Sequence, residues 1–376
     1  MTGFGHNIHG FGTITSVGES GPELWSWGQG GQGQLGMENT TSYSSPVLVG
    51  AGAWSNVSGG QFASLAVKSD GTLWSWGGGY SAAQGALGHN NTTSYSVPTQ
   101  VGTLTDWSKV ESWGLCPWTG AIKTDGTLWT WGIGSTGRLG DGSTTTKSSP
   151  VQIGSLTDWS KLAVGLYHAL AIKTDGTLWA WGGGYQGRVG DGTVTNRSSP
   201  VQIGALTTWA TIDCGDNQSF AIKTDGTMWS WGQNTNGHLG HGNTTDYSSP
   251  KQVGALTTWA KVGCGQQHVA AVKTDGTLWT IGYNNRGQIG DGSTTNRSSP
   301  VQIGSLTNWS TVACGVNNTF AVKTDSTFWS WGNADVGQLG HDNGTNISSP
   351  VQVGSLTNWS SNWAAAGSHN LALKNE

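Results

Sequence analysis

The sequence predicts an all-β fold, a seven-bladed β-propeller of four-stranded blades whose ring is closed by N- and C-terminal strands that share one blade. Three observations predict it: a tryptophan motif that recurs seven times, a hairpin signal beside most copies, and chain ends that each supply part of a repeat. The motif is Leu-Trp-x-Trp-Gly in most copies, and its first tryptophan lies at Trp25, Trp74, Trp129, Trp179, Trp229, Trp279 and Trp329. The last four intervals are all 50 residues, and a fixed period of this length is typical of propellers and solenoids.

Each repeat is expected to form four short strands, which we name a to d in chain order. In the fourth repeat we expect them over residues 159–164, 168–173, 177–181 and 200–203, with Asp175-Gly176 as the turn between b and c. Asp-Gly between two β-prone runs is a strong hairpin signal, because such turns need residues with positive φ. The pair recurs in most repeats, whereas Asp325-Ser326 departs from it and is expected to carry strain. No segment has helical periodicity, so four strands per repeat predict radial blades.

Paired tryptophans are expected to hold the blades together. In Trp-x-Trp both side chains point to the same face of the strand, and blades stack face to face. Core packing is therefore the expected role of these residues, and Ile281 alone replaces the second tryptophan.

The two ends of the chain are out of phase with the repeat. The chain begins in the middle of a unit, at residues 24–27, and residues 359–374 supply only strands a and b. We therefore expect residues 21–376 to form one propeller domain whose last blade is completed by both termini. Residues 1–20 are left as an N-terminal extension, in which residues 13–17 could add a strand or make an outside contact.

Composition limits the partners and the location. Charged residues make up 10% of the chain and its net charge is −4, so nothing suggests the clustered Lys and Arg that a nucleic-acid partner requires. No apolar run of 18 residues exists, which argues against membrane insertion. The first 17 residues lack the basic and apolar regions of a signal peptide, so a cytoplasmic location, or a virion if the gene belongs to a phage, is expected.

The repeats resemble those of the regulator-of-chromosome-condensation family. The resemblance rests on Gly-x-x-His-x-x-Ala-x-Lys-x-Asp-Gly-Thr-Leu-Trp-x-Trp-Gly, then Gly-Gln-Leu-Gly, then Ser-Ser-Pro-Val-Gln, and is clearest at residues 165–182 and 332–340. It implies a seven-bladed propeller whose termini share one blade. That family includes an exchange factor for a small GTPase, inhibitors of β-lactamases, and many bacterial and phage proteins. The inserted wedge and basic surface of the exchange factor are missing here, and the near-uniform, weakly charged repeats look like the bacterial and phage members.

No residue pattern predicts catalysis, a cofactor or a metal. Cys214, Cys264 and Cys314 recur at one position, where a small buried residue is needed and where the separation of the blades opposes shared ligation. His168, His268 and His369 share a position with Gln218 and Asn318, and this interchange favours a structural hydrogen bond over proton transfer. The Gly28-Gln-Gly-Gly-Gln-Gly33 run precedes no helix and so is not a dinucleotide site.

A partner-binding surface is predicted where the repeats deviate. The a–b and c–d loops share one face of the ring, which we name the loop face, and the b–c turns, with their Lys and Asp, lie on the opposite turn face. The c–d loop at residues 78–88 has three extra residues and the a–b segment at residues 111–118 has two, and deviating loops in repeat proteins often bind ligands. The predicted contact residues are Phe62, Tyr80, Trp113, Trp118, Tyr167, Asn217, Gln267 and Asn317.

These observations favour a non-enzymatic binding or structural propeller, one that binds proteins or a receptor within a larger assembly such as a phage tail, fibre or capsid. Other virion proteins, a host surface receptor or a glycan are the expected partners. One alternative is an inhibitor or regulator that binds a single protein through the loop face. A more remote alternative is a guanine nucleotide exchange factor.

Overall fold

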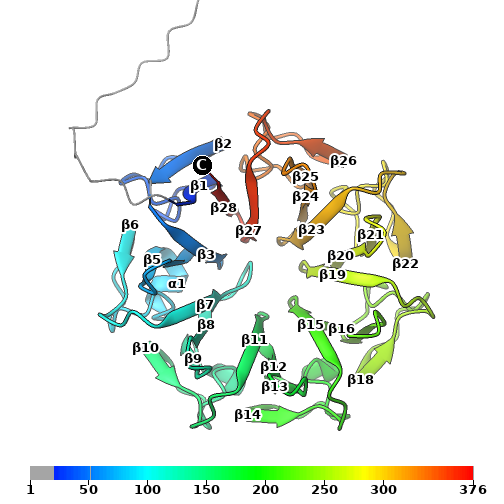
Figure 1. Cartoon of the computed structure of the whole chain (residues 1–376), viewed down its shortest axis with the longest axis horizontal. Coiled ribbons are helices and arrows are strands. Elements are labelled where there is room, and N and C mark those ends of the chain that lie inside the picture. Colours follow the sequence, from blue (N-terminus) through cyan, green and yellow to red (C-terminus); the bar gives the residue numbers. More distant parts are fainter. Residues whose placement is uncertain (1–20, 51, 376) are drawn as a thin grey trace, which may run out of the picture.

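The computed structural model describes residues 21–50 and 52–375, so the predicted extension and its residues 13–17 lie outside the described residues. Seven four-stranded antiparallel sheets are arranged radially around a central axis (Figure 1). We number these blades 1 to 7, blade 1 being the sheet β27-β28-β1-β2 and blade 2 the sheet β3-β4-β5-β6. The predicted all-β, seven-bladed propeller is confirmed.

Each of the four strand positions recurs once per blade, in order from blade 1 to blade 7. The innermost strands, a, are β27 (Trp359–Ala365), β3 (Trp54–Gly59), β7 (Trp107–Glu111), β11 (Trp159–Val164), β15 (Trp209–Cys214), β19 (Trp259–Cys264) and β23 (Trp309–Cys314). The b strands are β28 (His369–Lys374), β4 (Ala63–Lys68), β8 (Trp118–Lys123), β12 (His168–Lys173), β16 (Gln218–Lys223), β20 (His268–Lys273) and β24 (Asn318–Lys323). The c strands are β1 (Glu23–Gly28), β5 (Leu73–Gly77), β9 (Leu128–Gly132), β13 (Leu178–Gly182), β17 (Met228–Gly232), β21 (Leu278–Gly282) and β25 (Phe328–Gly332). The outer d strands are β2 (Tyr43–Gly50), β6 (Tyr95–Gln100), β10 (Lys147–Gln152), β14 (Arg197–Gln202), β18 (Tyr247–Gln252), β22 (Arg297–Gln302) and β26 (Ile347–Gln352).

Blade 1 closes the ring as the sequence predicts. Strand β1, near the start of the chain, pairs antiparallel with β28, at its end, from Glu23 opposite Lys374 to Gly28 opposite His369. The Lys374 ammonium lies 2.7 Å from the Glu23 carboxylate and adds an ion pair to the ladder. The two ends of the described chain are therefore joined within one sheet.

The second tryptophan of each motif seals the junction between neighbouring blades. Trp181 of blade 4 is fully buried, and its indole N–H donates to the carbonyl of Arg138 in blade 3 at 2.9 Å. Trp27, Trp76, Trp131, Trp231 and Trp331 donate in the same way to the preceding blade. Ile281 has no N–H to donate, so the junction of blades 5 and 6 lacks this bond.

The last glycine of Gly-Gln-Leu-Gly is explained by the same contact. Gly190 has a φ of +88°, and a Cβ built on it would lie 2.5 Å from the Trp231 indole nitrogen. A side chain here would push the tryptophan out of the junction, so the motif pairs a glycine of one blade with a tryptophan of the next.

The first tryptophan of each motif packs beside a lysine. In blade 4, Lys173 Nζ lies 4.4 Å from the ring centre of Trp179 and 5.0 Å from that of Trp159. The two indoles meet edge to face at 5.9 Å, an arrangement that favours both aromatic and cation–π attraction. Equivalent lysines recur in all seven blades, so on the turn face these lysines cover tryptophan rings.

Three extra residues in blade 2 form a structure that the sequence did not predict. They contribute to a short helix, α1 (Gly79–Ala83), and single 3₁₀ turns, η1 (Ser135–Gly137) and η2 (Tyr185–Gly187), occupy the equivalent loops of blades 3 and 4. Five residues are too few for helical periodicity to be visible in a sequence. No helix in residues 21–50 and 52–375 has the length and apolarity that crossing a membrane requires.

The turn at Ser326 provides a test of backbone strain. Ser326 has a φ of +60°, in the left-handed region, where Gly276 of blade 6 has a φ of +75°. We expect Ser326→Gly to raise the free energy of unfolding by about 0.5–1 kcal/mol, because glycine adopts this conformation without a Cβ clash. Urea unfolding followed by circular dichroism measures it.

The reverse substitution in blade 6, Gly276→Ser, is the matched control. A Cβ there would lie 2.1 Å from the Thr307 carbonyl oxygen, so this variant should be destabilised. A Ser326→Gly variant less stable than the wild type would contradict the expected strain.

Candidate functional site

The a–b and c–d loops do lie together on one face. In blade 4 the N–H of Gly183, which follows strand c, donates to the carbonyl of Tyr167, which precedes strand b, at 2.8 Å. In blade 5 the N–H of Gln233 donates to Asn217 at 2.9 Å. The antiparallel order of each blade and these bonds fix the loop face as a continuous layer.

A tyrosine–arginine cluster occupies this face over blades 2 to 4. We define it as Tyr80, Arg138, Tyr167, Tyr185 and Arg188. The Tyr167 ring lies between two guanidinium groups, 5.0 Å from that of Arg138 and 4.7 Å from that of Arg188. Arg188 also lies 5.8 Å from the ring of Tyr185. Burial lowers the pKa of Arg138, and Cys116, Tyr167 and Tyr80 act electrostatically against that shift.

Main-chain oxygens hold the two arginines in place. Arg138 donates to the carbonyls of Leu166 at 2.8 Å and Ser135 at 2.9 Å. Arg188 donates to the carbonyl of Tyr185 at 2.9 Å and to the side chain of Asn217. Both arginines are buried, whereas Tyr80 and Tyr185 are 50% and 66% exposed. The cluster therefore presents two exposed aromatic rings beside two buried arginines that hydrogen bonds hold in place.

The other predicted loop residues have mixed surroundings. Phe62 and Tyr167 are half-buried. Gln267 accepts a hydrogen bond from Asn236 at 2.7 Å, and Asn317 accepts one from Gln288 at 3.4 Å. Like Asn217, these amides are half-buried and hydrogen-bonded to the c–d loop of the preceding blade. Some of their hydrogen-bonding groups are therefore already paired within the ring.

Trp118 does not lie on the predicted partner-binding surface. Its side chain is fully buried, and its indole N–H donates to the Gly165 carbonyl at 3.0 Å. Trp118 pairs with Gly132 as His168 pairs with Gly182, so it fills the histidine position of the repeat. Pro117 instead occupies the position that Tyr167 has in blade 4. The sequence alone gives this register, because Trp118 lies five residues before Lys123 and His168 lies five residues before Lys173.

Trp113 is also not a surface residue. It is 6% exposed, and its indole N–H reaches across the ring axis from blade 3 to the carbonyl of Cys264 in blade 6, at 3.0 Å. Its neighbour Gly114 forms a parallel bridge with Ala366 of blade 1. The loop of residues 112–117, which we name the axial loop, therefore lies across the channel (Figure 1). The two extra residues give the loop this reach.

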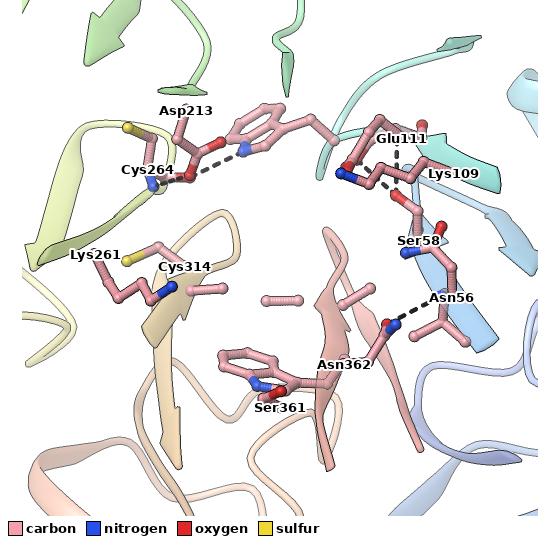
Figure 2. A pocket seen from close by; sticks show the side chains of 18 residues that line it. Asn56, Ser58, Lys109, Glu111, Asp213, Lys261, Cys264, Cys314, Ser361 and Asn362 are labelled. Atoms are coloured by element: carbon pink, nitrogen blue, oxygen red, sulfur yellow. Dashed lines mark hydrogen bonds between the residues drawn. The ribbon is translucent and has the colours of Figure 1, made fainter. Parts of the chain in front are cut away.

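A cavity of about 550 Å³ lies along the axis (Figure 2). It is lined mainly by the a strands and by Trp113. Figure 2 shows Lys109 and Glu111 on one wall and Asp213 and Lys261 on the opposite wall.

Two carboxyl groups in this cavity have raised pKa values. Burial raises the pKa of Glu111 to about 8, and the nearby Asp213 adds to that shift. Burial raises the pKa of Asp213 to about 7, against the effect of its hydrogen bonds from the N–H groups of Cys264 at 2.7 Å and Cys214 at 2.8 Å.

Side chains of one a strand satisfy the open edge of the next. Asn362 accepts the N–H of Val57 at 3.1 Å, and Asn56 accepts that of Val110 at 2.8 Å. An innermost strand has no neighbour on its axial side, so its free main-chain groups need partners of this kind. The polar residues of the channel wall are thus partly structural.

The histidines at this position of the repeat make structural hydrogen bonds, as predicted. His168 Nε2 lies 2.7 Å from Ser219 Oγ of the next blade, and His369 Nε2 lies 2.8 Å from Ser64 Oγ. Burial lowers the pKa of His369 to about 3, so the ring is neutral at physiological pH. The four cysteines are free and buried, and no group of three His, Cys, Asp or Glu suited to a metal ion occurs among the described residues.

Sequence reasoning missed Arg138, Tyr185 and Arg188 on the loop face and Glu111 and Asp213 in the channel. The arginines were detectable as Gly-Arg-Leu-Gly and Gly-Arg-Val-Gly in place of Gly-Gln-Leu-Gly. Glu111 and Asp213 each lie four residues after the tryptophan that begins their a strand. Only the closure of the ring makes the two carboxyl groups face one cavity.

Comparisons with known proteins agree on the family. A model of the RCC1-like domain matches residues 12–268, and models of the regulator of chromosome condensation (RCC1) repeat match residues 275–322 and 325–373. The chain is 30% identical over 156 residues to the human E3 ubiquitin-protein ligase HERC2, covering 40% of this chain and 3% of HERC2. It is 29% identical over 154 residues to the Arabidopsis thaliana ultraviolet-B receptor UVR8, covering 40% of this chain and 34% of UVR8.

Solved structures show the same fold at low identity. Human WBSCR16 superposes with a TM-score of 0.84 at 18% identity, covering 94% of this chain and 99% of that one. Prp20p from Saccharomyces cerevisiae superposes with a TM-score of 0.81 at 19% identity, covering 96% and 92%. The RCC1-like domain model alone spans more than half of the sequence. The chain therefore belongs to the regulator of chromosome condensation (RCC1) repeat family.

Proposed function

We propose that this chain is a non-enzymatic binding propeller that docks a protein partner on the loop face, over the tyrosine–arginine cluster. The observation that carries the proposal is the pair of exposed rings, Tyr80 and Tyr185, beside arginines fixed by main-chain oxygens. Tyrosine and arginine are enriched among the residues that dominate binding energy at protein interfaces. A base held rigid before binding also loses little conformational entropy when a partner docks.

The family supports a protein partner. Prp20p is described by its binding to Gsp1p and histones, and yeast RCC1 (Prp20) has been crystallised with Kap60. These partners belong to those proteins, and they support for this chain only the general idea that such a propeller presents a surface to another protein. The sequence also predicts narrower roles. One is a component of a virion, with a host receptor or glycan as its partner, and the other is a regulator of one protein. Both roles are compatible with the same surface.

The test is quantitative capture of a partner by purified chain. Wild-type bait should retain at least one stoichiometric protein from the native source, and the double variant Tyr80→Ala/Tyr185→Ala should weaken its binding by at least about tenfold. Loss of one interface anchor typically costs about 1–3 kcal/mol, and a tenfold change corresponds to about 1.4 kcal/mol. Biolayer interferometry with the recovered partner measures the change.

Tyr283→Ala is the matched control, since Tyr283 is a half-buried tyrosine of the loop face in blade 6, outside the cluster. It should bind like the wild type. Equal binding by the double variant would sink the proposed surface. Acceleration of nucleotide release from a recovered GTPase would support the exchange-factor alternative.

A further inference from the structure

We propose that the central channel binds a small polyanion, a ligand with two or three phosphate or carboxylate groups, through Lys109, Lys161 and Lys261. This inference is independent of the protein-docking surface on the loop face. It concerns the axial cavity of about 550 Å³ that Lys109 and Lys261 line, a size within the range of small-molecule sites.

The three lysines share one register of the ring. Each stands two residues after the first tryptophan of its strand, in β7, β11 and β19, where Asn56, Thr211 and Thr311 stand in other blades. Two of their ammonium groups reach along the channel wall to the next strand. Lys109 Nζ donates to the Ser160 carbonyl at 3.4 Å, and Lys161 Nζ donates to that of Ala210. A carbonyl oxygen accepts a hydrogen bond from one of the three ammonium N–H groups, and it does not neutralise the positive charge.

The positive charge in the channel is not balanced by carboxylates. Within residues 21–50 and 52–375, none of the three lysines has a carboxylate oxygen within 4.0 Å. All three lysines are exposed. Partial burial lowers the pKa of Lys161, and the charges of Lys109 and Lys261 lower it further, so Lys161 lies within electrostatic range of both of the other ammonium groups.

The carboxyls of the cavity do little to cancel this charge. With pKa values of about 8 and 7, Glu111 is mostly protonated and Asp213 about half protonated at pH 7. The lysines at the ends of the b strands, by contrast, lie over tryptophan rings. The channel is thus a concentration of unpaired cations in a chain whose net charge is −4.

The axial loop also gives the site a direction. Trp113 and Gly114 cross the ring at the loop-face end. The lysines lie nearer the turn face, because strand a starts beside the b–c turn of the preceding blade, as the bond from Trp159 N–H to the Gly126 carbonyl at 3.1 Å shows. Figure 2 shows the Lys109 and Lys261 side chains extending into the cavity. A polyanion that enters from the turn face therefore meets the ammonium groups first.

Isothermal titration calorimetry of the full chain at pH 7.5 tests the site, with tripolyphosphate and citrate as separate probes at matched ionic strength. One equivalent of at least one probe should bind per chain, and the triple variant Lys109→Gln/Lys161→Gln/Lys261→Gln should bind at least tenfold more weakly. Binding of tripolyphosphate alone identifies a phosphate ligand, and binding of citrate alone a polycarboxylate.

The control removes the same charge elsewhere. Lys147→Gln/Lys251→Gln/Arg286→Gln lowers the net charge equally but changes cations outside the channel, and it should bind like the wild type. If both triple variants weaken binding equally, or if neither probe binds saturably to the wild type, the proposal is wrong. Should the channel variant fail to fold, Lys261→Gln alone is expected to weaken binding about three- to tenfold, and unchanged affinity would count against the site.

Discussion

Replacement of Trp231 by alanine is expected to lower the free energy of unfolding by about 3–5 kcal/mol, as for other large aromatic truncations in close-packed cores. Trp231 is fully buried between blades 4 and 5, and its indole N–H donates to the Arg188 carbonyl at 3.0 Å. Alanine would leave a cavity and a buried carbonyl without its donor. Urea unfolding of the purified chain, followed by far-ultraviolet circular dichroism, measures the loss.

Two further variants separate packing from hydrogen bonding. Trp231→Phe keeps most of the apolar volume but removes the donor, and should cost about 1–2 kcal/mol. Trp229→Ala, on the same strand, removes a half-buried ring bonded to Thr227 at 2.9 Å, and should cost less than Trp231→Ala. An equal effect of Trp229→Ala and Trp231→Ala would show that the second tryptophan has no special role at the junction.

The second large effect is the loss of stability that two channel carboxyls cause between pH 6.5 and pH 8. The raised pKa values of Asp213 and Glu111, about 7 and 8, mean that the folded chain holds protons that the unfolded chain has released. Stability is therefore highest below the unfolded pKa values of these carboxyls and declines as pH rises through the folded ones. In this window the two groups together account for about 2 kcal/mol, Glu111 for the larger part.

Other buried groups also titrate in this window, so the effect of the carboxyls is isolated by comparison with a variant. Buried histidines such as His268, with a pKa of about 3, add stability as the pH rises through about 6.5, where the unfolded imidazole loses its proton. Burial raises the pKa of buried thiols such as Cys314, so cysteines reduce stability as the pH approaches about 8.5, where the unfolded thiol ionises. These contributions are the same in the wild type and in a Glu111 variant and cancel in the difference.

Glu111→Gln is expected to gain stability relative to the wild type as the pH rises from 6.5 to 8, because the amide has no proton to release. Glu38→Gln, at an exposed glutamate, should keep the wild-type slope. Urea midpoints at pH 6.5, 7.25 and 8 measure both. A Glu111→Gln variant with an undiminished slope would show that this carboxyl does not titrate in the window.

The sequence by itself determined the repeat, the hairpins, the family and the closure of the ring. These follow from short-range rules, since Asp-Gly turns and Trp-x-Trp strands act within a few residues and recur at a fixed spacing. The positive φ of Ser326 also followed from its place in the turn. The structural role of His168 followed from its interchange with Gln218 and Asn318.

Only the tertiary structure decided which residues of the deviating loops are accessible and which charges meet. Trp113 reaches Cys264, 151 residues away along the chain, because the axial loop turns inward. Trp118 is buried and bonded to Gly165 of the next blade, and its neighbour Pro117 is buried as well. Glu111 and Asp213 lie about two repeats apart in the sequence and Lys109 and Lys261 about three, and only the curvature of the closed ring brings them into one cavity. Local pattern specifies strands and turns, whereas the direction of an inserted loop and the surroundings of a side chain on the axis depend on all seven blades.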